Sequence, residues 1–105
     1  MPKIETQQAK EIEAMHTMLR LTVNNHPGVM SHVVGMFSRR AYNVDGILCL
    51  PVGCGATSRI WLLVNEDVRL PQMIKQAEKL EDVIAIRRHG ADHAVFERLE
   101  EFFRA

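Results

Sequence analysis

The pattern of apolar and polar residues along the chain is typical of a small domain with several short strands. One segment, residues 17–24, alternates, which predicts a strand with one face in a core, and three others are mainly apolar runs that suit strands as well. Pro51 interrupts the second strand near its end, and Gly90 is expected to end the last one. The four predicted strands cover residues 17–24, 44–52, 58–65 and 82–88.

Two other segments carry apolar residues three and four positions apart, which predicts amphipathic helices. The first helix is expected to begin at the Asn-His-Pro-Gly segment 25–28, because Asn25 can cap a helix and the fixed φ of Pro27 suits the first helical position. The second is predicted over residues 67–80, with Pro71 tolerated in its first turn. The apolar stripe of the first helix is Val29, Val33 and Phe37, with Met30, Val34 and Ala41 beside it.

The order of these elements is strand, helix, strand, strand, helix, strand. The turn at residues 53–57 is too short for a parallel crossover, so the second and third strands should form an antiparallel hairpin. This order is that of the α+β, ferredoxin-like βαββαβ fold, in which two helices cover one face of a four-stranded antiparallel sheet. The sequence therefore predicts a single domain over residues 15–90.

Segments outside this domain carry weaker patterns. Residues 1–14 have little to bury and are expected to form a flexible or weakly helical extension. Residues 91–105 are expected to form an amphipathic C-terminal helix, which either packs on its own domain or helps to bind a partner chain. Its apolar positions are Val95, Phe96, Leu99, Phe102 and Phe103.

Composition and charge exclude several classes of protein. Apolar residues make up 47% of the chain and charged residues 25%, the balance of an ordinary globular protein. Thirteen basic residues are matched by 13 acidic ones, so no net field attracts nucleic acid. No apolar run is long enough to cross a membrane, and no signal-peptide core precedes the domain, so a cytoplasmic protein is expected.

Candidate catalytic and metal-binding groups are sparse. Cys49 and Cys54 are five positions apart, which matches neither a zinc site nor a redox motif, so two reduced thiols are expected. The five histidines are scattered, and Gly90 interrupts the pair His89 and His93. No carboxylate pair or phosphate loop stands out. We therefore expect neither a catalytic site nor a metal or cofactor bound by this chain.

The Asn25–Gly28 turn offers a binding site without any catalytic group. The first N–H groups of the helix, at Gly28, Val29 and Met30, lie at the positive end of the helix dipole and suit a carboxylate. Gly28 allows a ligand to approach the backbone, and the amide of Asn25 can accept from an ammonium group. A free amino acid carries both charges. On local grounds alone, however, a simple helix cap is the favoured interpretation.

A longer stretch carries a family resemblance. The segments Asn25–Val33 and Gly35–Pro51 resemble the ACT domain of acetohydroxyacid synthase (acetolactate synthase) regulatory subunits. The short chain and the segments 60–65 and 79–83 are most similar to the single-domain small subunits of the isozyme I type. The resemblance spans about residues 18–103.

The resemblance implies a non-catalytic regulatory subunit that activates a large catalytic subunit and makes it sensitive to valine, with isoleucine and leucine as further candidates. That partner is expected to hold thiamine diphosphate, FAD and Mg²⁺. The small chain is expected to form a homodimer with the effector at the junction. A structural partner that stabilises an enzyme without sensing a ligand is the alternative. The implied effector-binding residues are Asn25, His26, Pro27, Gly28, Val29 and Met30 of one copy and Asn43 and Val44 of the other.

Overall fold

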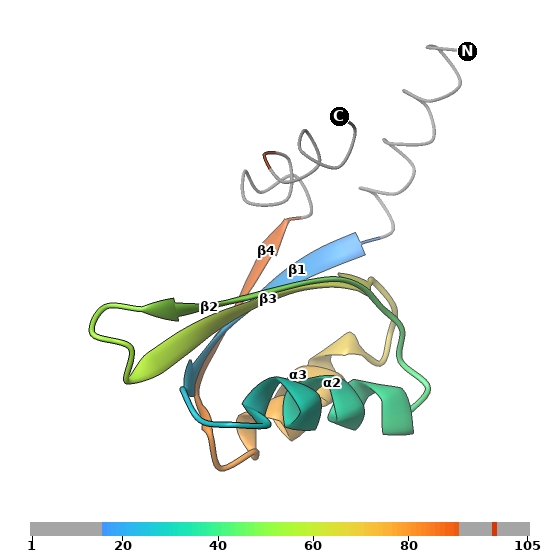
Figure 1. The fold of residues 1–105 in the computed structure, drawn as a ribbon. Coiled ribbons are helices and arrows are strands. Elements are labelled where there is room, and N and C mark those ends of the chain that lie inside the picture. Colours follow the sequence, from blue (N-terminus) through green and yellow to red (C-terminus); the bar gives the residue numbers. More distant parts are fainter. Residues whose placement is uncertain (1–15, 91–97, 99–105) are drawn as a thin grey trace.

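The fold is known from a computed structural model, which describes residues 16–90 and residue 98 (Figure 1). The order β-α-β-β-α-β is confirmed. The expected extension at residues 1–14 and the expected helix at residues 91–105 lie outside the described residues, apart from residue 98. The elements are β1 His16–Asn24, α2 Val29–Arg39, β2 Val44–Val52, β3 Thr57–Asn65, α3 Leu70–Glu78 and β4 Val83–Gly90.

The four strands form one antiparallel sheet in the order β2-β3-β1-β4, and both helices cover the same face of it (Figure 1). This is the predicted ferredoxin-like α+β fold. The hairpin of β2 and β3 places β2 at one edge of the sheet, while β4 returns beside β1 at the other edge. The start of α2 follows directly from the central strand β1, so the Asn25–Gly28 turn lies at one end of the sheet.

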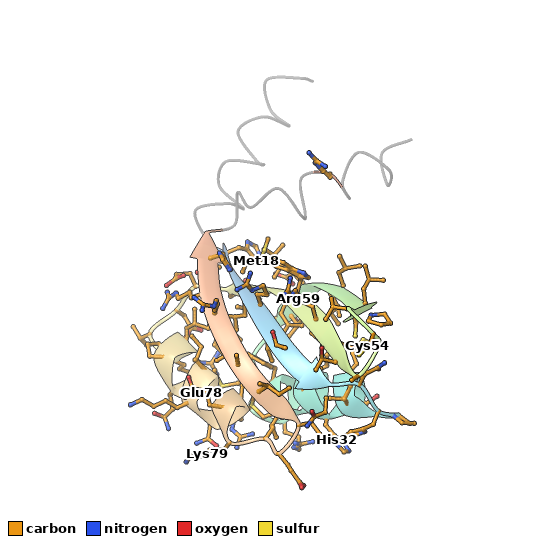
Figure 2. The ribbon with its side chains drawn as sticks, turned by 90° about the vertical axis from the view of Figure 1, so that its left-hand side faces the viewer. Met18, His32, Cys54, Arg59, Glu78 and Lys79 are labelled. Atoms are coloured by element: carbon orange, nitrogen blue, oxygen red, sulfur yellow. The ribbon has the colours of Figure 1, made fainter. Side chains whose placement is uncertain are left out.

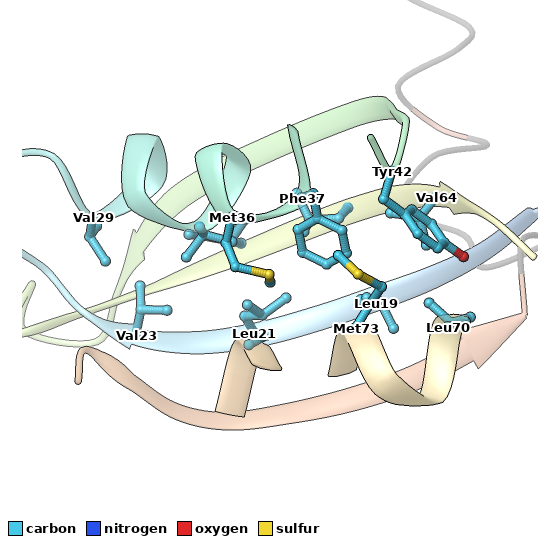
Figure 3. Packing of buried hydrophobic residues seen from close by; sticks show 14 residues of the cluster. Leu19, Leu21, Val23, Val29, Met36, Phe37, Tyr42, Val64, Leu70 and Met73 are labelled. Atoms are coloured by element: carbon cyan, nitrogen blue, oxygen red, sulfur yellow. The ribbon is translucent and has the colours of Figure 1, made fainter. Parts of the chain in front are cut away.

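The core lies between the sheet and the two helices (Figure 3). Alternate residues of the two central strands point into it, as the sequence pattern predicts. Phe37 of α2 is fully buried there, and its ring meets that of Tyr42 edge-on, with centroids 5.9 Å apart at 72°. The buried strand residues are Leu19, Leu21, Val23, Ile60, Leu62 and Val64.

The predicted start of α2 is wrong in detail. The helix begins at Val29 and is capped by Gly28, which has φ 85° and makes no side-chain capping bond. Pro27 is therefore not the first helical residue, and Asn25 is not the cap. The Asn25 side chain instead donates a hydrogen bond to the carbonyl oxygen of Gly55, in the β2–β3 turn. A tertiary contact has replaced the local capping role that Asn favours.

The buried stripe of α2 also differs from the prediction. Met36 is buried at 2% exposure, while Met30 is 43% exposed and Ala41 lies beyond the helix on the surface. The helix ends in a Schellman motif, in which Ala41 N–H donates to Ser38 and Tyr42 N–H donates to Phe37. Ala41 takes the left-handed conformation that this motif requires, with φ 53°.

Two element boundaries shift for local reasons. α3 begins at Leu70 rather than at residue 67, because the Asp67 side chain accepts the N–H of Arg69 at 2.7 Å and forms a turn before the helix. Pro71 lies in the first helical turn, as predicted. β4 covers Val83–Gly90 rather than residues 82–88, and Gly90, at its end as predicted, pairs with Thr17 of β1.

Candidate functional site

A hollow of about 580 Å³ lies where the start of α2 meets the edge strand β2. Cavities that hold small molecules commonly enclose about 300–1,000 Å³. One wall is the turn between β1 and α2 with the first helical turn, and the other wall is the middle of β2. The lining residues are Asn25, His26, Gly28, Val29, Met30, Ser31, Ile47, Leu48 and Cys49.

Asn25 is fastened to the β2–β3 turn by two hydrogen bonds. Its side-chain Nδ2 donates to Gly55 O at 2.8 Å, and its backbone N–H donates to Ala56 O at 3.0 Å. With Nδ2 directed at Gly55, the Oδ1 atom of the same amide is the acceptor that a ligand's ammonium group would meet. Figure 2 labels Cys54, which precedes Gly55 in this turn. The hairpin therefore sets the orientation of the first polar group in the cavity.

His26 is held from the opposite side by the turn between α3 and β4. Its Nδ1 donates to the carbonyl oxygen of Pro27 at 2.8 Å, and its Nε2 forms an ion pair with Asp82. The backbone of Asp82 also accepts the N–H of Asn24 at 2.9 Å. The hydrogen bond to Pro27 raises the pKa of His26, and the contact with Asp82 raises it further.

Gly28 provides the backbone geometry at the helix start. Its φ of +85° is a left-handed conformation that L residues rarely adopt, and a Cβ at this position would meet no atom within 4 Å. That open space lies beside the N–H end of α2, where the helix dipole favours a negative charge. The N–H of Val29 donates weakly to His26 O at 3.3 Å. Over residues 16–90, no backbone acceptor takes the N–H of Gly28 or Met30.

The wall from β2 was missed from the sequence. Ile47 and Cys49 pair with Leu62 and Ile60, which point into the core, so both lie on the sheet face that carries the helices. Ile47 is nevertheless 43% exposed, because α2 leaves this part of the edge strand uncovered. Burial raises the pKa of the Cys49 thiol, so it is a neutral, weakly polar group at neutral pH. Cys49 and Cys54 are free thiols, as expected.

The alternation along β2 was the available signal for this wall. It places Ile47 and Cys49 on the same face of β2, but it does not say whether that face carries the helices. The side of the sheet on which these residues lie depends on the register with β3, which the sequence alone does not specify.

Two predicted site residues lie apart from the cavity of the same copy. Asn43 and Val44 are not among its lining residues. The Asn43 side chain donates to Asp45, whose other carboxylate oxygen lies 2.6 Å from His16 Nε2. Val44 packs against the core. Within one copy, the cavity is therefore lined by residues of the segment 25–30 but not by Asn43 or Val44. Pro27 does not line it, but its carbonyl oxygen accepts the hydrogen bond from His26.

The combination of groups suits a small zwitterion with an apolar side chain. Backbone N–H groups at a helix start suit a carboxylate, the Asn25 amide oxygen suits an ammonium group, and Ile47 with Cys49 suits an aliphatic side chain. Over residues 16–90 and 98, no group of three or more His, Cys, Asp or Glu side chains is placed to hold a metal ion. His93, weighed above with His89, lies outside the described residues. No helix in the described chain could span a membrane.

Comparison with known proteins adds independent findings. The family model described as the AHAS small subunit-like ACT domain matches residues 19–85. The chain is 55% identical to the acetolactate synthase isozyme 1 small subunit of Escherichia coli (strain K12), over 85% of this chain and 93% of that protein. It is 36% identical to the acetolactate synthase small subunit of Mycobacterium bovis, over 80% of this chain but 50% of that longer protein.

A solved structure extends the comparison to three dimensions. The crystal structure of the acetolactate synthase small subunit from Thermotoga maritima superposes with a TM-score of 0.63 and 26% sequence identity. The match covers 85% of this chain and 68% of that chain. The family match over residues 19–85 includes the turn after β1, α2 and β2, which together line the cavity.

Proposed function

Because the chain belongs to the family of ACT-domain small subunits of acetolactate synthase, we propose that it is a non-catalytic regulatory subunit that binds valine in the cavity between α2 and β2. Isoleucine and leucine are the further candidate effectors. A pocket of this kind distinguishes ligands that differ by one methylene group only weakly, by about 1–3 kcal/mol. Bound valine transmits feedback inhibition of branched-chain amino acid biosynthesis to the catalytic subunit.

The observation that carries this proposal is the composition of the cavity. Its two walls present opposite chemistry, because the α2 wall is polar at Asn25 and Gly28 whereas the β2 wall is apolar at Ile47 and Cys49. A branched-chain amino acid has the same division between its charged head and its aliphatic side chain. In this arrangement the effector carboxylate meets the N–H groups of α2, and its ammonium group meets Asn25.

A second copy of the chain completes the site in this proposal. β2 is an edge strand, and Pro51 within it is compatible with an edge position. If two β2 strands pair antiparallel about Leu48, Val44 of one copy lies opposite Val52 of the other. Val52 immediately precedes the turn whose Gly55 holds Asn25. Such pairing would bring Asn43 and Val44 of one copy toward the cavity of the other, which supports a homodimer as the functional unit.

The catalytic partner in this proposal is the large subunit of the same enzyme, which holds thiamine diphosphate, FAD and Mg²⁺ in the cytoplasm. The small chain activates this subunit, and valine shifts the equilibrium between its active and inactive forms. A ligand shifts such an equilibrium only by its differential affinity for the two forms, typically about 1–3 kcal/mol of coupling.

Two measurements test the proposal. Calorimetric titration of the purified chain with valine, isoleucine and leucine should give saturable binding, and valine should raise the unfolding temperature. Reconstitution with the catalytic subunit should then give higher activity that valine suppresses. Activation without any valine response would favour the structural partner over the sensor. Absence of heat and of a thermal shift at millimolar valine would overturn the proposal.

A further inference from the structure

A carboxylate far from the cavity in sequence lies directly behind its polar wall. Asp82, in the turn between α3 and β4, forms an ion pair with His26, which lines the cavity. The Asp82 carbonyl oxygen also accepts the N–H of Asn24 at 2.9 Å. The β1–α2 turn is thus held on two sides, by the β2–β3 turn through Asn25 and by the α3–β4 turn through Asp82. Only the second of these ties involves ionisable side chains.

The geometry of His26 favours the protonated ring. Both of its ring nitrogens face oxygen acceptors, the Pro27 carbonyl at Nδ1 and the Asp82 carboxylate at Nε2. A neutral imidazole has a single N–H, so one of its nitrogens would present a lone pair to an oxygen. The imidazolium donates from both nitrogens and satisfies both contacts. The turn is therefore held best when His26 carries a proton.

From this arrangement we infer that Asp82 is a positioning residue for the effector site, acting through protonated His26 to hold the Asn25–Gly28 turn in its binding conformation. The inference rests on the function proposed above and adds its regulation by protons. Effector affinity is then highest when His26 is charged and falls as the pH rises and His26 loses its proton. By linkage, bound effector must also raise the affinity of His26 for its proton.

The titratable groups around His26 support assigning the proposed pH dependence to the pair of His26 and Asp82. The carboxylates that act on His26 are Asp82 and Glu81, both from the α3–β4 turn. The first turn of α2 has no acidic residue, and its first titratable side chain is His32. The β2–β3 turn contributes Cys54 as its titratable group. The His26 side chain is 41% exposed, so protons exchange freely with solvent, while Asp82 is the more buried partner at 23%.

The experiment is a calorimetric titration of the full chain with valine between about pH 6 and about pH 8. For the unmodified protein we expect the dissociation constant to rise by about three- to tenfold across this range. Asp82→Asn keeps an oxygen acceptor but removes the charge, and His26→Gln keeps a donor but does not titrate. Both variants should bind valine more weakly at the acidic end and lose most of the pH dependence. A uniform loss of affinity that keeps the original slope would overturn the inference.

His32→Gln is the matched control, because His32 is an exposed histidine on α2 that does not line the cavity (Figure 2). This variant should keep both the affinity and its pH dependence. If instead it removes the slope, or if the unmodified protein binds valine equally at both pH values, the inference is wrong.

NMR titration of the histidine rings separates this inference from the proposed function. The pKa of His26 should fall in Asp82→Asn without any effector and rise in the unmodified protein when valine is added. Failure of the unmodified protein to bind valine at any pH would overturn the proposed function. An unchanged His26 pKa in Asp82→Asn would overturn the inference whether or not valine binds.

Discussion

Asn25 Nδ2 donates a hydrogen bond of 2.8 Å to the carbonyl oxygen of Gly55, so the turn that starts α2 is fastened to the tip of the β2–β3 hairpin. This contact joins two segments 30 residues apart and orients the amide of a residue that lines the cavity. Together with the hydrogen bond from Asn25 N–H to Ala56 O, it couples the position of the hairpin turn to the cavity.

Asn25→Ala removes both the contact with Gly55 and the amide oxygen that faces the cavity. We expect a loss of about 0.5–1.5 kcal/mol in the free energy of unfolding and a loss of valine binding by at least tenfold. Urea denaturation and calorimetry measure the two effects. Asn24→Ala is the control, because Asn24 is exposed and does not line the cavity. Equal effects on valine binding in the two variants would contradict the role of Asn25.

Gly28→Asp and Gly28→Asn separate charge from conformation at the helix start. Asn and Asp tolerate the left-handed region better than other L residues, and a Cβ here meets no neighbour within 4 Å, so both variants should fold with similar stability. The aspartate places a negative charge where we expect the effector carboxylate. Calorimetry at low salt should therefore show at least tenfold weaker valine binding for Gly28→Asp than for Gly28→Asn. Equal affinities would place the carboxylate elsewhere.

The strands and helices follow from the sequence because their apolar periods match the faces that the fold buries. The alternation of Leu19, Leu21 and Val23 fixes the core face of β1. In β3 both faces are apolar, and its core face follows from the pairing of Leu62 with Leu19. In α2 the period alone did not separate Met36, which is buried, from Met30, which is exposed. The difference depends on where the helix lies over the sheet. Met30 lies beside the open cavity, which it lines, and so stays exposed.

The candidate site was only half visible in the sequence. The contiguous turn from Asn25 to Gly28 could be recognised as a helix start with spare N–H groups. The residues that hold this turn in place could not be recognised, because Gly55 and Asp82 contact it from 30 or more residues away in the sequence. For the same reason the sequence predicts a capping role for Asn25 that the structure does not show. Its side chain satisfies a distant carbonyl instead of the local helix.

Ala41→Gly should stabilise the protein. Ala41 ends α2 in the left-handed conformation with φ 53°, which costs a residue with a Cβ about 1–2 kcal/mol, whereas glycine adopts it without this cost. Part of the gain is offset by the greater freedom of glycine in the unfolded chain, so we expect about 0.5–1 kcal/mol. Urea denaturation measures it. Ala85→Gly, at an exposed position of β4, should destabilise instead, and stabilisation there too would refute the conformational explanation.

The stability of the fold should depend on the protonation of His26. Its pKa is raised in the folded state, so the folded protein binds this proton more tightly than the unfolded chain. The stabilisation is therefore complete below the ordinary histidine pKa of about 6.5 and is lost as the pH rises through the higher folded value. In urea denaturation, the difference in midpoint between the unmodified protein and His26→Gln should be larger at about pH 5.5 than at about pH 8.5. A difference in midpoint that grows with pH would contradict the predicted sign of this pH dependence.

The proposed pairing of two copies along β2 can be tested with two equally exposed side chains. Leu50 of β2 and Ile84 of β4 are each 56% exposed, and their strands form opposite edges of the sheet. If a second copy covers β2, Leu50→Lys places a charge in the interface, whereas Ile84→Lys leaves its charge in solvent.

Sedimentation equilibrium should then show self-association weakened by about tenfold or more for Leu50→Lys alone. Valine affinity should fall with it, because Asn43 and Val44 of the second copy would no longer reach the cavity. Weaker association in Ile84→Lys, with Leu50→Lys unchanged, would move the interface to β4. Loss of the dimer with full valine affinity would mean that one copy binds the effector alone.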